Sequence, residues 1–171
     1  KIPSSVTSIE AKAFENCAKL KEIIFEENSN LSSIGDCAFN GCSSLKKIKI
    51  PSSVTKIGKQ VFEKCIKLKE IQFDDHSNLS SIDDGAFTRC TLLPGISIPP
   101  SVISIGANVF KGCSSLIQIS IPSSVTTIGS RIFSKCEKLE TIEFQEKSKI
   151  SLINDYSFSE CPSLGKIKIP S

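Results

Sequence analysis

Cysteine spacing is the first feature of this sequence that could indicate chemistry. Seven cysteines each stand three residues after a phenylalanine and three residues before a leucine, as in "AFENCAKLKEI" at residues 13–23. Such thiols could serve as nucleophiles, metal ligands or disulfide partners. A zinc site requires closely paired ligands supplemented by histidine, but the closest cysteine pair is Cys37 with Cys42, and the single histidine is His76. A structural metal is therefore not expected.

The repeated cysteines have two further interpretations. Disulfides between neighbouring repeats are geometrically conceivable if strands stack about 5 Å apart, because bridged Cα atoms lie within about 7 Å. However, seven is an odd number, and the cysteines form an unbroken series. We expect these thiols to fill a core as small apolar groups, as free cysteine commonly does. A hydroxyl placed there would have no evident hydrogen-bond partner.

Cys37, the eighth cysteine, belongs to a different position of the repeat. The equivalent residues in other repeats are charged, small or large, which is typical of a solvent-facing position: Lys12, Gln60, Gly85, Asn108, Arg131 and Tyr156. We therefore expect one exposed thiol, which could form an intermolecular bridge or act as a reactive handle. Nothing nearby is arranged to activate it, so a substitution without function is the favoured interpretation.

Catalytic residues and cofactors are not expected in this chain. A nucleophile requires a base within reach, and His76 stands in a polar connector, "DDHSN", where a turn residue is the usual explanation. The nine glycines are spread along the chain rather than gathered in a phosphate-binding loop. Nucleic acid binding is not expected either. All ten phenylalanines fall in apolar columns, no tryptophan is present, and the net charge of +3 is not concentrated in one segment.

An internal repeat of 23 or 25 residues must position these side chains. It is marked by seven phenylalanines: Phe14, Phe39, Phe62, Phe87, Phe110, Phe133 and Phe158. Alternation in "LKKIKI" predicts a strand with Ile48 and Ile50 on one side and Lys47 and Lys49 on the other. One repeat is too small to form a core, so the strands must stack in register. The Phe-x-x-Cys segment is expected to form one helical turn, with both side chains inward.

Two kinds of connector account for the two repeat lengths. The short kind reads "IPSSV", and the long kind inserts two residues, as in "FEENSNL". Proline cannot donate to a sheet ladder, so strand ends are predicted at Pro51, Pro99, Pro122 and Pro170. Pro94-Gly95 falls inside the fourth strand, which we expect to be short or bent. A turn with positive φ is predicted after each Val-x-x-Ile pair, at Glu10, Gly35, Gly58, Asp83, Gly106, Gly129 and Asn154.

The unit Leu-x-x-Ile-x-Ile-Pro-x-x-Val-x-x-Ile-Gly-x-x-Ala-Phe-x-x-Cys closely resembles the BspA-type leucine-rich repeat, found in surface-associated proteins of oral bacteria and mucosal protozoan parasites. The resemblance covers essentially all 171 residues, although Val61, Val109, Ile132 and Ser157 replace the alanine before phenylalanine. It implies a right-handed solenoid, with a short parallel strand, a turn and a single helical turn in each unit, and a role in adhesion to host matrix proteins or cells. We expect residues 1–171 to form one solenoid within a longer repeat array, because no polar capping repeat stands at either end.

The exposed strand positions vary between repeats, which is how repeat proteins carry recognition. The densest basic patch consists of Lys21, Lys46, Lys47, Lys49 and Lys69. It could bind an acidic protein segment or a sulfated glycan. The alternative is a solvated lysine face beside Glu22 and Glu70. We slightly favour this alternative, because exposed charges on a protein surface usually contribute little binding energy.

Two functions remain open for this chain. One is an adhesion module at the cell surface or in secreted form; the other is an intracellular interaction scaffold, for which a column of free thiols in a reducing compartment would be natural. Asn30 and Asn78 each begin Asn-Leu-Ser, a glycosylation sequence if the chain is secreted by a eukaryote, and this supports the surface location. No apolar run approaches the roughly 18 residues of a membrane span, so this segment is not expected to insert. Exposed end repeats could pair end to end.

Overall fold

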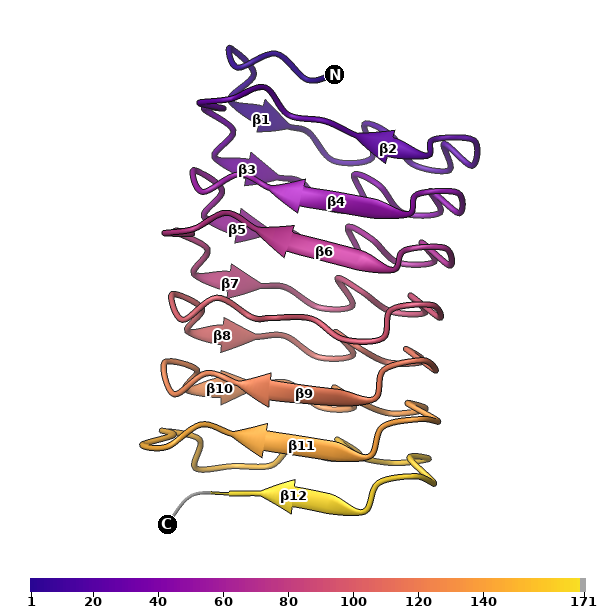
Figure 1. The fold of residues 1–171 in the computed structure, drawn as a ribbon, viewed down its shortest axis with the longest axis vertical. Coiled ribbons are helices and arrows are strands. Elements are labelled where there is room, and N and C mark those ends of the chain that lie inside the picture. Colours follow the sequence, from indigo (N-terminus) through magenta and orange to yellow (C-terminus); the bar gives the residue numbers. More distant parts are fainter. Residues whose placement is uncertain (170–171) are drawn as a thin grey trace.

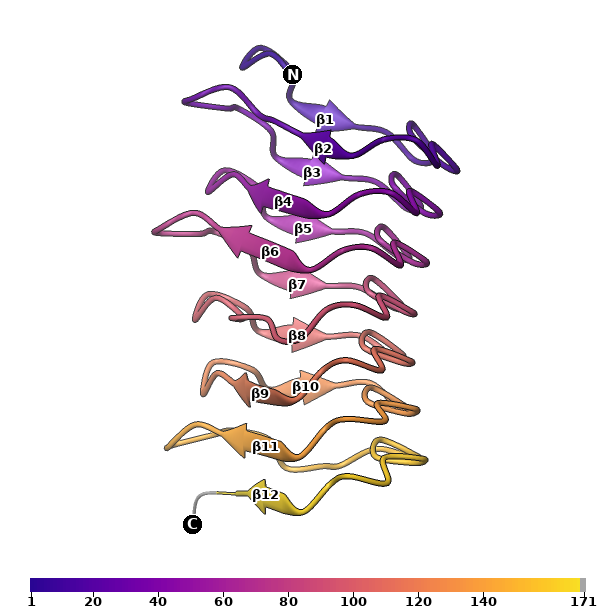
Figure 2. The same ribbon diagram turned by 45° about the vertical axis from the view of Figure 1, so that its right-hand side comes forward.

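The chain forms a right-handed β-solenoid whose turns stack along one axis (Figure 1). The computed structural model describes residues 1–169, so the strand end predicted at Pro170 lies outside the described residues. One complete turn of the solenoid, called a rung below, carries one repeat. The rungs are numbered by their phenylalanines, from Phe14 in the first rung to Phe158 in the seventh. Figure 2 shows the strands of the front and back faces running in opposite directions across each rung.

The back face is one continuous parallel sheet in the order β1-β3-β5-β7-β8-β10. Each strand is only two residues long and ends on a buried isoleucine. The register therefore pairs isoleucine with isoleucine, as Ile34 pairs with Ile57. The strands are β1 Ser8–Ile9, β3 Ser33–Ile34, β5 Lys56–Ile57, β7 Ser81–Ile82, β8 Ser104–Ile105 and β10 Thr127–Ile128.

The front face consists of two three-stranded parallel sheets, β2-β4-β6 and β12-β11-β9. Their strands are β2 Glu22–Ile23, β4 Lys47–Ile50, β6 Glu70–Phe73, β9 Gln118–Ile121, β11 Thr141–Phe144 and β12 Lys166–Lys168. In β4 the predicted alternation is confirmed, because Ile48 and Ile50 are buried while Lys47 and Lys49 are exposed. Strands β4 and β9 end immediately before Pro51 and Pro122, as the missing proline N–H requires.

Pro94 interrupts the front face at the fourth rung. Residues 94–98 form no strand, and Ser97 makes only an isolated bridge to Ser120 of β9. The backbone amide of Ile117 still donates to the Pro94 carbonyl at 3.1 Å. Proline has no N–H to donate in the opposite direction, so pairing with β6 is lost. The expectation of a short or bent fourth strand is therefore confirmed, and the back face alone carries an unbroken sheet past this point.

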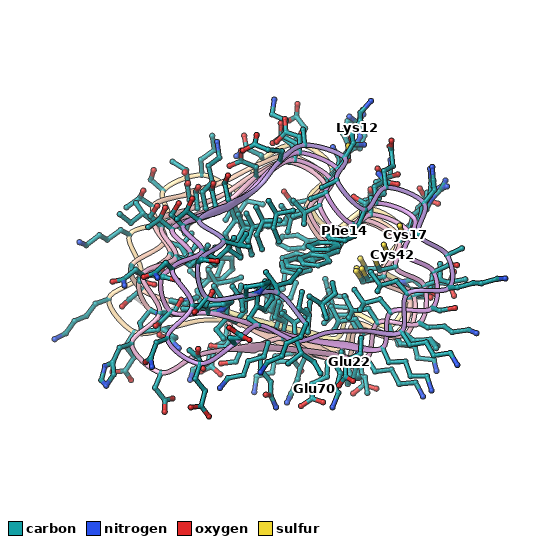
Figure 3. All side chains as sticks on the ribbon, turned by 90° about the horizontal axis from the view of Figure 1, so that it is seen from above. Lys12, Phe14, Cys17, Glu22, Cys42 and Glu70 are labelled. Atoms are coloured by element: carbon teal, nitrogen blue, oxygen red, sulfur yellow. The ribbon has the colours of Figure 1, made fainter. Side chains whose placement is uncertain are left out.

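The interior is built from columns of identical side chains. The seven phenylalanine rings stack through the whole solenoid, with centroids 5.2–6.0 Å apart and interplanar angles of 2–12°. Figure 3, viewed along the axis, shows these rings in the centre and the sulfur atoms at one side of them. The five inner rings are fully buried, which supplies each rung with an apolar core that it could not form alone.

The single helical turn predicted for the Phe-x-x-Cys segment is wrong, since the described residues contain no helix. Two residues in each of these segments have positive φ, for example Lys12 at 62° and Asn16 at 57° in the first rung. They produce consecutive tight turns whose amide groups point along the solenoid axis. The amide of Phe14 accordingly donates to Ala38 of the next rung at 2.8 Å. Hydrogen bonding between rungs replaces the bonding within a helix, while phenylalanine and cysteine still point inward.

Glycine in the column of Gly35, Gly58, Gly106 and Gly129 serves a different purpose from the one predicted. None of the seven residues of this column has positive φ; the left-handed residue comes two positions later. Neighbouring rungs instead approach closely here. A Cβ atom on Gly129 would lie 2.2 Å from the backbone nitrogen of Ala107, and one on Gly58 would lie 2.6 Å from the Asp36 carboxylate. The close approach of neighbouring rungs therefore favours glycine at these positions, although Asp83 and Asn154 fill the same column in two other rungs.

Candidate functional site

The repeated cysteines are core residues with a specific hydrogen bond. The five inner thiols are fully buried, and each donates from Sγ to the carbonyl oxygen of the phenylalanine in the preceding rung, at 3.1–3.3 Å. The core interpretation is confirmed for these five, and all eight cysteines are free. The expectation that a hydroxyl would lack a partner is wrong, because the Phe87 carbonyl beside Cys113 could accept its proton.

Burial makes these thiols poor nucleophiles. Desolvation raises the pKa of Cys42 to about 11 and that of Cys113 to about 12, and it raises the pKa of Cys90 well above its usual value. The thiolate is the reactive form of cysteine. A buried column that stays protonated at neutral pH therefore stabilises the core without offering redox or metal chemistry.

Cys37 is half-buried rather than exposed, which corrects the sequence-based expectation. Its φ of 57° is in the left-handed region, as at the equivalent positions of the other rungs, and its side chain lies against the next rung. The Sγ atom lies 3.8 Å from Oε1 of Gln60. Burial, with a smaller contribution from the Glu15 carboxylate, raises the pKa of this thiol. Cys37 therefore has no activated thiolate.

The remaining candidate for chemistry, His76, has a structural role. His76 has a φ of 58° in an exposed connector, which confirms its interpretation as a turn residue. Within residues 1–169, no three His, Cys, Asp or Glu side chains converge as a metal site. The same residues contain no helix that is long and apolar enough to cross a membrane.

The five lysines of the predicted patch fall into two groups. The Lys47 ammonium lies 3.1 Å from the Glu22 carboxylate. The Lys49 ammonium pairs with Asp74, whose hydrogen bond and charge raise the lysine pKa. These two side chains are therefore largely neutralised by neighbours on adjacent rungs.

Lys21, Lys46 and Lys69, called the lysine column below, remain without an acidic partner among the described residues. They directly follow the repeated leucine of the first three rungs, at the edge of the front face. The backbone amide of Lys46 donates to the Lys21 carbonyl at 3.2 Å, and the amide of Lys69 donates to the Lys46 carbonyl at 2.8 Å. This ladder holds three exposed ammonium groups one rung apart, at a spacing of about 5 Å between backbones.

A shallow groove of about 460 Å³ lies beside the lysine column. Its lining contains four lysines and two glutamates: Lys21, Glu22, Lys46, Lys47, Lys69 and Glu70. Figure 3 shows Glu22 and Glu70 pointing outward from the front face. Because Lys47 pairs with Glu22, the groove has excess positive charge from the lysine column. The arrangement is suited to an anionic ligand.

A second groove, of about 630 Å³, was not anticipated from the sequence. The long connectors at residues 25–31 and 73–79 project beyond the short connector between them, as Figure 2 shows. The groove between them is lined by Lys47 and Lys49 and by five carboxylates: Glu22, Glu26, Glu27, Glu70 and Asp74. The alternation of 25- and 23-residue repeats is the sequence signal that could have revealed it. Lys49 belongs to this acidic groove rather than to the lysine column.

Asn30 and Asn78 are exposed, but their side chains already have hydrogen-bond partners. Each Nδ2 donates to a backbone carbonyl of the preceding rung, at Ser4 and Ser52 respectively, with a distance of 3.1 Å. The leucine of each Asn-Leu-Ser sequence is fully buried. The Nδ2 atom carries two hydrogens, so one of them can make this bond while the other is replaced by a glycan. Glycosylation of Asn30 and Asn78 stays a prediction.

Comparison with known proteins decides the family. The sequence profile of the BspA-type leucine-rich repeat region matches residues 1–94 and 80–171, with six copies. The chain belongs to the BspA-type leucine-rich repeat family. The family consists of interaction repeats, so the chain is a protein-interaction module whose fold is typical of binding proteins rather than of enzymes. No curated protein has a matching sequence.

Solved structures of bacterial leucine-rich repeat proteins share the BspA-type fold of this chain. The leucine-rich repeat protein of T. pallidum is 30% identical, with a TM-score of 0.76, and the match covers 96% of this chain and 72% of that one. The pneumococcal vaccine antigen PcpA is 27% identical, with a TM-score of 0.71, and the match covers 99% of this chain. The chain spans only half of the PcpA chain.

Proposed function

We propose that the chain is an adhesion module that works at the cell surface or in secreted form and binds anionic regions of host matrix proteins, cell-surface proteins or glycans. The lysine column carries this proposal, because its three exposed ammonium groups, which have no acidic partner within residues 1–169, repeat at the rung spacing. An exposed charge that is not neutralised within its own protein is available for complementarity with a partner. The likeness to a pneumococcal vaccine antigen supports the surface location.

Reversing the charge of the lysine column is expected to weaken binding. The double variant Lys46→Glu/Lys69→Glu should lower affinity for heparin or for an acidic matrix protein by about tenfold or more, because attraction is replaced by repulsion. Neither side chain contributes to the core, so the variant should fold. Binding of the recombinant chain to immobilised heparin and to a panel of matrix proteins is measured at two salt concentrations. Wild-type binding should weaken as salt rises.

The matched control reverses the charge of two lysines elsewhere. Lys138→Glu/Lys149→Glu alters two exposed lysines of the sixth and seventh rungs that form no salt bridge among the described residues. This variant should bind nearly as well as the wild type. Equal losses in the two variants would show that net charge alone controls binding, and unchanged binding by Lys46→Glu/Lys69→Glu would exclude the lysine column as the site. Labelling of the full-length protein only on permeabilised cells would contradict the surface location.

A further inference from the structure

The surface next to the lysine column, on the fourth and fifth rungs, is apolar. The residues directly after the repeated leucine of each rung form one exposed series, called the edge column below: Lys21, Lys46, Lys69, Pro94, Ile117, Glu140 and Gly165. Backbone hydrogen bonds continue along it beyond the fourth rung, since Ile117 donates to Pro94 at 3.1 Å and Glu140 donates to Ile117 at 2.8 Å. The edge column is thus basic over three rungs and apolar over the next two.

Exposed aliphatic side chains stand in the edge column or within three residues of it on neighbouring rungs. Ile66, Leu92 and Ile117 occur on the third, fourth and fifth rungs at this corner of the solenoid, and they are 43%, 42% and 44% exposed. Their positions in other rungs hold mostly small, polar or charged residues. The position of Leu92, for example, holds Lys19, Ser44, Lys67, Ser115, Lys138 and Ser163. These three side chains lie away from the first and last rungs, so their exposure is not caused by the open ends of the solenoid.

The interruption at Pro94 coincides with the change from basic to apolar surface. Proline provides no N–H, so the backbone bond that joins Lys69 to Lys46 has no equivalent between Pro94 and Lys69. The Lys69 carbonyl is therefore left beside the exposed Pro94 ring at the centre of the edge column. A partner with backbone N–H groups could use this acceptor, whereas an apolar ligand could not.

We propose that the partner at this site is an extended polypeptide segment with acidic residues at one end and apolar side chains at the other. Its acidic end lies over the lysine column, and its apolar end lies against Pro94, Leu92 and Ile117. Charge complementarity selects an anionic partner, and the adjoining aliphatic surface favours a polypeptide over a sulfated glycan, which carries no aliphatic side chains. The first to fifth rungs span four intervals of about 4.8 Å, which an extended segment of about six residues covers. This inference rests on the proposed function of the lysine column.

Two labelled peptides of equal length test whether the site binds apolar side chains next to acidic ones. One has three glutamates followed by three leucines, which matches the roughly six residues that span the site, and the other has serines in place of the leucines. The variant Leu92→Ser/Ile117→Ser should weaken binding of the first peptide by about fivefold or more, because it removes half-exposed apolar surface that the leucines would cover. It should leave binding of the second peptide unchanged. Fluorescence anisotropy measures both affinities. Ile103→Ser serves as the control, because it changes an aliphatic side chain that is 52% exposed directly before β8.

The two proposals fail in different ways in this experiment. If Lys46→Glu/Lys69→Glu weakens binding of both peptides while Leu92→Ser/Ile117→Ser changes neither, the lysine column stands and the acidic–apolar segment is overturned. Heparin binding that is tighter than peptide binding and insensitive to the serine variant would assign the site to a glycan and also overturn the segment. Failure of heparin and both peptides to bind the wild-type chain would overturn both proposals.

Discussion

Gly129→Ala is expected to destabilise the solenoid by about 2–4 kcal/mol, although it adds a single methyl group. The new Cβ atom would lie 2.2 Å from the backbone nitrogen of Ala107 and 2.4 Å from its Cα atom. These atoms are backbone, so no side-chain rotation can relieve the overlap. The fifth and sixth rungs would have to separate, which would strain the hydrogen bond from the Gly129 amide to the Ile105 carbonyl at 2.8 Å. Urea unfolding monitored by circular dichroism measures the loss.

Gly95→Ala is the matched control for this prediction. A Cβ atom there would meet nothing closer than the Gln118 carbonyl at 4.0 Å, and the residue has no positive φ. Alanine should therefore be neutral or should stabilise by a few tenths of a kcal/mol, because it restricts the unfolded chain. Similar losses for Gly95→Ala and Gly129→Ala would mean that the close approach of rungs does not explain the glycine column.

The sequence was most informative where burial repeats in every rung. Phenylalanine, cysteine, leucine and isoleucine recur because each faces the same interior in each rung, so their columns could be read directly. The alternation in β4 and the interruption at Pro94 followed from elementary rules of sheet geometry. These predictions depend only on the residue itself and on its immediate neighbours along the chain.

The errors occurred where one pattern fits two conformations. Phenylalanine and cysteine three residues apart fit a helical turn, but they also fit two consecutive turns with positive φ. Lysine and arginine occupy several of these left-handed positions, including Lys64 and Arg89. The residue types therefore did not indicate positive φ. Glycine likewise serves either positive φ or close approach. The distinction at Gly129 depends on Ala107, which belongs to the preceding rung.

Partners separated by a whole rung explain the remaining differences. The thiol of Cys113 donates to a carbonyl 26 residues earlier, and Lys49 pairs with Asp74, which lies 25 residues later. Such contacts depend on the register and on the connector lengths. The predicted five-lysine patch therefore could not be divided into paired and unpaired members before the rungs were placed.

Alkaline pH is expected to unfold the chain through its buried thiols. Cys65, Cys90, Cys113 and Cys136 have folded-state pKa values raised by burial, to about 12 for Cys113, whereas an unfolded cysteine titrates near its ordinary value of 9.0. Above pH 9 the unfolded state therefore binds fewer protons than the folded state, so stability falls as pH rises. The stabilisation is fully present below pH 9 and is lost progressively toward the folded pKa values.

Each of these four thiols should lower the free energy of unfolding by roughly 1.4 kcal/mol per pH unit within this range. Together they contribute a slope of about 5–6 kcal/mol per pH unit, which is comparable to the whole stability of many domains. We therefore expect the thermal midpoint to change little between pH 7 and 8 and to fall steeply between pH 9 and 10.5. Calorimetry under reducing conditions measures this profile. A flat profile up to pH 10.5 would contradict the prediction.

The double variant Cys90→Ser/Cys113→Ser separates the thiols from other alkaline effects. Serine does not ionise in this range, and each hydroxyl could donate to the carbonyl that the thiol now contacts, on Phe62 or Phe87. The slope above pH 9 should fall by roughly 2.7 kcal/mol per pH unit, which is two thiols at 1.36 each. Lysine and tyrosine titration is common to both proteins and cancels in the difference. Cys37→Ser, at a half-buried thiol, should change the slope much less; an equal change would mean that alkaline sensitivity does not come from the buried column.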